Sequence, residues 1–135
     1  MANEATIVTL LGNQGDPVEF TVATGTAIPK GTLMQLSATG GVASASSGDG
    51  EFFCGIAAIE KTTTDGIVKM PCITHCVALM TAGTGATTFG QPQKLSGANL
   101  VIDADDDTIA NSREVVGLSL DTVADGNQGS VLVNL

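Results

Sequence analysis

The longest hydrophobic feature of the chain consists of two runs separated by a short polar segment. Residues 52–61 are apolar and partly β-branched, and residues 67–79 are rich in Ile, Val, Thr and Cys. Between them, residues 62–66 end in Asp-Gly, a pair that readily adopts the left-handed backbone of a tight reversal. Two β-prone runs around such a turn predict a β-hairpin, which we expect to be the spine of the core. Glu60 and Lys61, just before the turn, are expected to set this end of the hairpin and its solubility.

Shorter segments on both sides of the hairpin alternate between apolar and polar residues. Residues 17–23 and 131–135 each place their apolar side chains on one face, and residues 114–122 do the same with Val116, Leu118 and Leu120. Turn signals separate these segments at short intervals, and no segment keeps the 3.6-residue period of an amphipathic helix with capping signals. The pattern predicts an all-β fold, a small single-domain sandwich or barrel over residues 16–135.

The N-terminal segment is set apart from this domain, because Gly12 and Gly15 uncouple it from the next β-prone segment. We predict a flexible N-terminal arm over residues 1–15. The β-prone part of the arm consists of Ala5, Thr6, Ile7, Val8, Thr9, Leu10 and Leu11. As a strand it carries apolar or β-branched side chains on both faces, so it must be covered. It is either the first edge strand of the domain or a strand that pairs with another chain.

Composition bears on the surface and on the classes of partner. Charged residues make up 14% of the chain, against about 25% in a typical domain, so the charges are too few to coat a monomer. The net charge is −9, and the five cations are widely scattered. Nucleic acids and anionic membranes bind clustered Lys and Arg, so neither is an expected partner. No stretch approaches the roughly 18 apolar residues of a membrane span.

The three cysteines are Cys54, Cys72 and Cys76, and the single histidine is His75. An odd number of cysteines without an export signal favours reduced thiols in a cytosolic setting. On a strand, Cys72 and Cys76 face one side and His75 the other, so they cannot converge on a metal. For the same reason His75 cannot act as a base toward Cys76. We expect buried structural thiols, no catalytic residues and no cofactor.

One acidic segment partly matches a calcium-binding loop. Asp103, Asp105 and Asp107 occupy positions 1, 3 and 5 of the twelve-residue loop template, Asn111 occupies position 9 and Glu114 position 12. Thr108 stands where the template requires glycine, and the flanking segments are β-prone rather than helical. A solvated acidic loop is the favoured interpretation, and calcium binding is the alternative.

Five short motifs succeed one another along the chain: AIPKGTLM (27–34), FCGIA (53–57), EK (60–61), LSGAN (95–99) and VGLSL (116–120). In this order they resemble the capsid cement, or head decoration, proteins of tailed bacteriophages. That family's usual pattern is I-x-K-G-T-L, then F-x-G-I-A and E-K, and a late V-G-x-A-L. The chain departs from it at Ser119, where Ala is usual, and at residues 72–76, where a plain apolar strand is common.

The resemblance implies an all-β structural protein that reinforces the outside of a mature phage head as a homotrimer at local threefold positions. Its partner would be the major capsid protein, and its location the virion exterior after synthesis in the host cytoplasm. No catalysis and no cofactor are implied. The arm residues 5–11 are then expected to grip the capsid by strand addition. The alternative is a β module of a phage tail, fibre or adhesin, including a calcium-binding one.

Overall fold

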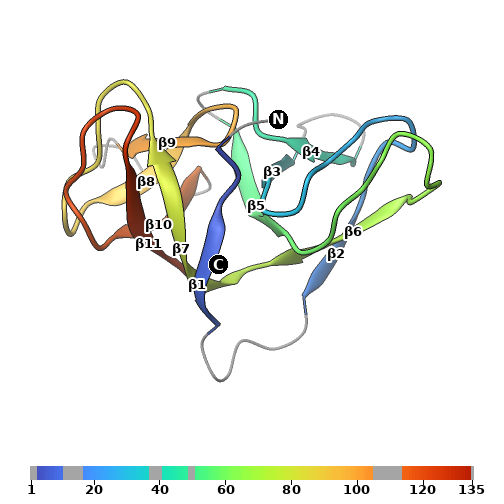
Figure 1. Cartoon of the computed structure of the whole chain (residues 1–135), viewed down its shortest axis with the longest axis horizontal. Coiled ribbons are helices and arrows are strands. Elements are labelled where there is room, and N and C mark those ends of the chain that lie inside the picture. The colour runs from blue at the N-terminus through green and yellow to red at the C-terminus, as the bar shows by residue number, and fades with distance from the viewer. Residues whose placement is uncertain (1–2, 11–16, 37–40, 49–50, 105–113, 135) are drawn as a thin grey trace.

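Two β-sheets that share part of their core make up the fold (Figure 1). The computed structural model describes residues 3–10, 17–36, 41–48, 51–104 and 114–134. The strands are β1 (Thr6–Leu10), β2 (Val18–Thr21), β3 (Leu33–Leu36), β4 (Ala43–Ala45), β5 (Phe52–Ala57), β6 (Lys69–Ile73), β7 (His75–Ala82), β8 (Pro92–Gly97), β9 (Leu100–Asp103), β10 (Val115–Ser119) and β11 (Gln128–Asn134). The predicted all-β fold is confirmed. The described ranges contain no helix able to cross a membrane.

The first sheet has six strands in the order β1-β7-β11-β10-β8-β9. Within this order, β7, β11, β10, β8 and β9 follow one another, and a parallel pairing joins β7 to β9. These five strands therefore close into a small barrel. β1 lies outside this ring and pairs antiparallel with β7. The barrel is filled by inward-facing residues such as Leu95, Val101 and Val131, all of which are buried.

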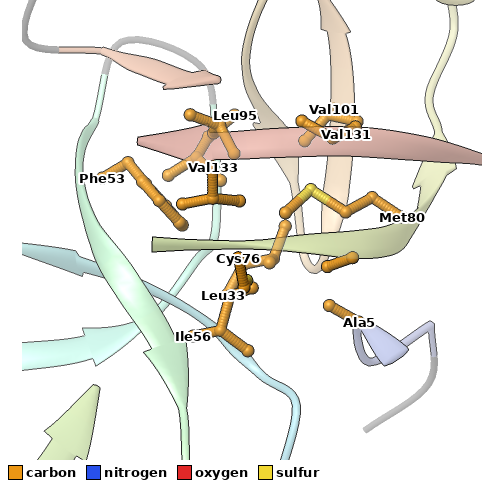
Figure 2. Packing of buried hydrophobic residues seen from close by; sticks show 12 residues of the cluster. Ala5, Leu33, Phe53, Ile56, Cys76, Met80, Leu95, Val101, Val131 and Val133 are labelled. Atoms are coloured by element: carbon orange, nitrogen blue, oxygen red, sulfur yellow. The ribbon is translucent and has the colours of Figure 1, made fainter. Parts of the chain in front are cut away.

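The second sheet has five strands in the order β2-β6-β5-β3-β4. An isolated bridge between Val22 and Ala43 brings its two outer strands together, so this sheet is also strongly curved. Its own core contains Ile28, Met34 and Met70. Three further side chains of this sheet, Leu33, Phe53 and Ile56, belong instead to the core of the first sheet, where Figure 2 shows them gathered with Cys76 and Val133.

The predicted central hairpin is present as β5 and β6, which pair antiparallel around residues 62–66. Asp65 holds the turn, because its carboxylate accepts hydrogen bonds from the backbone N–H groups of Thr62 (2.7 Å) and Ile67 (3.1 Å). These bonds keep the pKa of Asp65 below its usual value. The second apolar run does not continue as one strand, however. It breaks at Thr74, and its two halves, β6 and β7, lie in different sheets.

Lys61 does not serve as a solvating charge, contrary to the sequence-based expectation. Its side chain is fully buried. The ammonium group donates to the backbone carbonyls of Thr24 (2.6 Å), Thr26 (2.8 Å) and Thr62 (3.4 Å). A buried charge is tolerated only when its hydrogen-bonding capacity is filled, and here three carbonyls fill it. Lys61 therefore ties the β2–β3 connection to the end of the central hairpin.

A closed circuit of hydrogen bonds joins the two sheets. The Leu33 N–H donates to Asn99 Oδ1 (2.8 Å), and the Asn99 N–H donates to Ser46 Oγ (2.8 Å). The Ser46 N–H returns to the Leu33 carbonyl (2.8 Å). Asn99 lies in the β8–β9 turn with φ 57°, a left-handed conformation that asparagine tolerates better than most residues. All three residues are buried, so water cannot replace these bonds.

We expect Asn99→Ala to lower the free energy of unfolding by about 2–4 kcal/mol. The substitution leaves the buried Leu33 N–H without its acceptor. In addition, alanine lacks the polar side chain that lets asparagine tolerate a positive φ. Asn99→Gly is the matched variant, since it loses the same acceptor but accepts the backbone conformation, and its loss should be smaller. Urea unfolding of both variants measures the two contributions. Wild-type stability in Asn99→Ala would show that the circuit does not hold the sheets together.

Candidate assembly surface

The predicted arm segment lies in the domain's own sheet, as the edge-strand interpretation expected. Ala5 is buried, and its N–H donates to the Gly31 carbonyl (2.6 Å). Ile7 packs against the core of the first sheet. The backbones of Thr9 and Leu10 pair with β7. Leu11 and the predicted boundary between residues 15 and 16 lie outside the described residues.

Strand β1 carries a bulge at Val8. In its register with β7, Ile7 pairs with Ala78 and Thr9 with Val77, so Val8 has no partner. The side chain of Val8 is 54% exposed. The bulge breaks the strict alternation predicted for this segment, because an extra residue shifts the register by one. β1 is also the last strand at this end of the sheet, so one of its edges has no neighbouring strand in the described part of the chain.

A cavity of about 320 Å³ lies beside β1, in the seam between the two sheets. It is lined by Ala5, Thr6, Ile7, Lys30, Gly31, Ala57 and Ile73. Most of these side chains are small or apolar, and Lys30 supplies the only charge among them. The close approach of the backbones here requires glycine, because Gly31 has φ 88° and a Cβ at this position would collide with the Ala5 carbonyl. The cavity is large enough to hold an apolar side chain.

A row of apolar residues crosses the outside of the barrel. Pairing places Pro92 of β8 beside Leu118 of β10, Leu118 beside Leu132 of β11, and Leu132 beside Val77 of β7. We call these four residues the outer ladder. Leu118 is 40% exposed and the other three are half-buried. Strands β7, β10 and β11 contain no Asp, Glu, Lys or Arg, so no charge lies within them beside the ladder.

The alternation of apolar and polar residues in the sequence did not predict the outer ladder. Alternation predicted Val116 and Leu118 on one face, but Val116 is buried and Leu118 points outward. The register between β10 and β8 shifts between Val115 and Gly117, which reverses the faces of the following residues. Gly117 is required there, because a Cβ would overlap the Leu132 carbonyl of the neighbouring strand. The equivalent prediction for β11 is confirmed, since Val131 and Val133 are both buried.

The acidic segment is only partly described. Asp105 and Asp107 lie outside the described residues, and Glu114 is half-buried just before β10. One oxygen of Asp103 already accepts hydrogen bonds from the Thr88 N–H and the Gln93 side-chain amide, both at 2.8 Å. Among the described residues, no group of three His, Cys, Asp or Glu side chains is placed to hold a metal.

The carboxylate of Asp103 links the β7–β8 connection to the barrel through its hydrogen bonds with Thr88 and Gln93. Partial burial raises the pKa of Asp103, but the hydrogen bonds from Thr88 and Gln93 outweigh this effect and keep the pKa below its usual value. A depressed pKa means that the charged carboxylate favours the folded state.

The thiols are buried, as predicted, but they are divided between the two sheets. Cys54 and Cys72 belong to the core of the five-stranded sheet, and Cys76 to the core of the barrel. His75 is half-buried at the start of β7. Burial alone raises the pKa of Cys76 to about 11, so its thiol stays protonated at neutral pH.

Comparisons with known proteins identify no family for this chain. Neither a scan against protein-family models nor a search of the curated proteins gives a match. The structure itself defines a small all-β protein with two features that fit association with other chains. These are the uncharged outer ladder and the open edge of β1.

We expect the contribution of Asp103 to stability to depend on pH. Its stabilising effect should be complete above the pKa of an unfolded aspartate, near 4, and should disappear as the pH falls through the lower folded-state pKa. Asp103→Asn should therefore be less stable than the wild type at pH 7 and equally stable near pH 2. Thermal unfolding between these pH values measures the effect. A difference in melting temperature between Asp103→Asn and the wild type that stays constant with pH would contradict an electrostatic role.

Proposed function

We propose that this protein is a structural, non-enzymatic subunit that decorates and stabilises the outside of a mature tailed-phage head as a homotrimer. The observation that carries the proposal is the outer ladder, an apolar row on the outside of a barrel without charges on its central strands. The ordered resemblance of five motifs to head decoration proteins supports the assignment of the partner, the major capsid protein.

The outer ladder fits contact between copies of the chain. Each copy carries a net charge of −9, so two copies repel one another through most of their surfaces. The apolar ladder is where the approach of a second copy costs least and where burial of surface gains most, about 25 cal/mol per Å². Leu118 lies at the centre of the three-strand segment β8-β10-β11 and is the most exposed member of the ladder.

The charge of the chain fits a position on the head exterior. Packaged DNA inside a head would attract clustered Lys and Arg, whereas this chain is acidic and its cations are scattered. A protein that faces solvent needs no such cluster. The acidic surface also keeps unassembled copies apart and soluble.

The open edge of β1 fits contact with the shell. A strand of the capsid can pair with that edge, and an apolar side chain of the added strand can enter the neighbouring cavity. The bulge at Val8 limits pairing to a partner that accommodates it, which protects the edge from nonspecific association. Three such edges in one trimer would add by avidity.

The trimer is tested with a charge placed on the ladder. Wild-type protein should have the mass of three chains in size-exclusion chromatography with light scattering, and Leu118→Lys should have the mass of one. Val68→Lys is the matched control, because Val68 is 50% exposed but lies outside the ladder. A monomeric wild type, or a trimeric Leu118→Lys, would refute the ladder as the contact between copies.

The shell contact is tested by sedimentation of the protein with purified heads of the phage that encodes it. We expect binding to expanded heads at saturation, and loss of binding in Val8→Asp without loss of the trimer. Val18→Asp serves as the control, since Val18 is 45% exposed on a different sheet. Absence of binding by the wild type would refute the decoration function. Full binding by Val8→Asp would place the shell contact away from the β1 edge.

A further inference from the structure

Four sulfur-containing side chains lie together in the core of the five-stranded sheet. They are Met34, Cys54, Met70 and Cys72, and each is at most 3% exposed. Cys54 comes from β5 and Cys72 from its neighbour β6, the two strands of the central hairpin. The third cysteine, Cys76, lies in the core of the other sheet and has no part in this cluster.

Glycine at position 55 brings the two cysteine-bearing strands close together. Gly55 has φ 131°, a conformation that other residues rarely adopt, and a Cβ at this position would lie 2.8 Å from the Cβ of Cys72. Only glycine therefore permits the approach of β5 to the Cys72 side chain. The two cysteines, eighteen positions apart in the sequence, therefore lie in one buried core, and the residue next to Cys54 closely approaches Cys72.

The Cys72 thiol is held within this core by a backbone group, because its Sγ donates to the Met70 carbonyl at 3.7 Å. The interaction with Cys72, together with burial, raises the pKa of Cys54 far above its usual value. The interaction with Cys54 lowers the pKa of Cys72 despite burial, so Cys72 is the more acidic thiol of the pair.

We propose that Cys54 and Cys72 are a convertible dithiol, which forms an intramolecular disulfide when the protein meets a small-molecule disulfide oxidant such as oxidised glutathione. When the core opens locally or the chain refolds, the Cys72 thiolate becomes accessible, attacks the oxidant and releases one glutathione thiolate. The Cys54 thiolate then attacks the sulfur of Cys72 and releases the second. The two protein thiols lose two electrons and two protons, and one oxidant disulfide becomes two thiols.

The disulfide would cross-link the two strands of the central hairpin and close the intervening chain into a loop. Such a link stabilises chiefly by restricting the unfolded chain. The occasion for oxidation rests on the proposed function, because a virion protein made in a reducing cytoplasm is released into an oxidising exterior at lysis. The chemistry itself does not depend on that function and can be tested on the purified chain.

The experiment compares full-length protein kept in reductant with protein exposed to oxidised glutathione, both in buffer and during refolding from urea. Each sample is denatured and alkylated, and its molecular mass is measured by mass spectrometry. The reduced protein should take up three alkyl groups, one for each cysteine. The oxidised protein should take up one, at Cys76, and peptide mapping should link Cys54 to Cys72. The melting temperature should rise by roughly 5–10 °C on oxidation.

Three variants make the result specific. Cys76→Ser should still gain the disulfide and the higher melting temperature, whereas Cys54→Ser and Cys72→Ser should gain neither. Three alkylated thiols after both oxidations, or a disulfide that includes Cys76, would overturn the proposal. These outcomes are independent of the sedimentation with heads, so failure of either proposal can be recognised without the other.

Discussion

The arrangement of the two sheets depends on a buried junction where three distant segments satisfy one another's backbone N–H groups, two of them through side-chain oxygens. Leu33, Ser46 and Asn99 each contribute one donor and one acceptor to a closed circuit, and each is shielded from water. An N–H left unpaired there would cost more than a typical hydrogen bond contributes, because no solvent can compensate it. The circuit therefore permits one relative position of β3 and the β8–β9 turn, and the shared core around Leu33 is packed in that position.

The junction also decides which surfaces remain for association. With the sheets fixed, β7 pairs with β11, β9 and β1, and Leu118 on the outer side of the barrel remains 40% exposed. The outer ladder lies there, and the open edge of β1 lies at the seam. The two surfaces are carried by adjoining strands, so in the assembly that we propose one face would bind a second copy while the edge met another protein.

Several of the few charged side chains in this chain are hydrogen-bonded to backbone groups. Lys61 directs its charge inside, toward three backbone carbonyls. Asp65 and Asp103 direct their carboxylates at backbone N–H groups, and Asp121 does the same by accepting from the Ser130 N–H at 2.8 Å. Charged residues are thus used to close turns and connections, which lets short strands end sharply.

The amino-acid sequence by itself determined the local structure. Alternating polarity and the Asp-Gly turn predicted the all-β fold, the β5–β6 hairpin and the inward faces of Val131 and Val133, because each depends on neighbours within a few residues. Only the tertiary structure decided that the apolar run breaks at Thr74, that Lys61 is buried, and that a bulge turns Leu118 outward. It alone brought Asn99 to Leu33, 66 residues away, and Cys54 to Cys72. These features arise from packing between distant segments, which leaves no periodic signal along the chain.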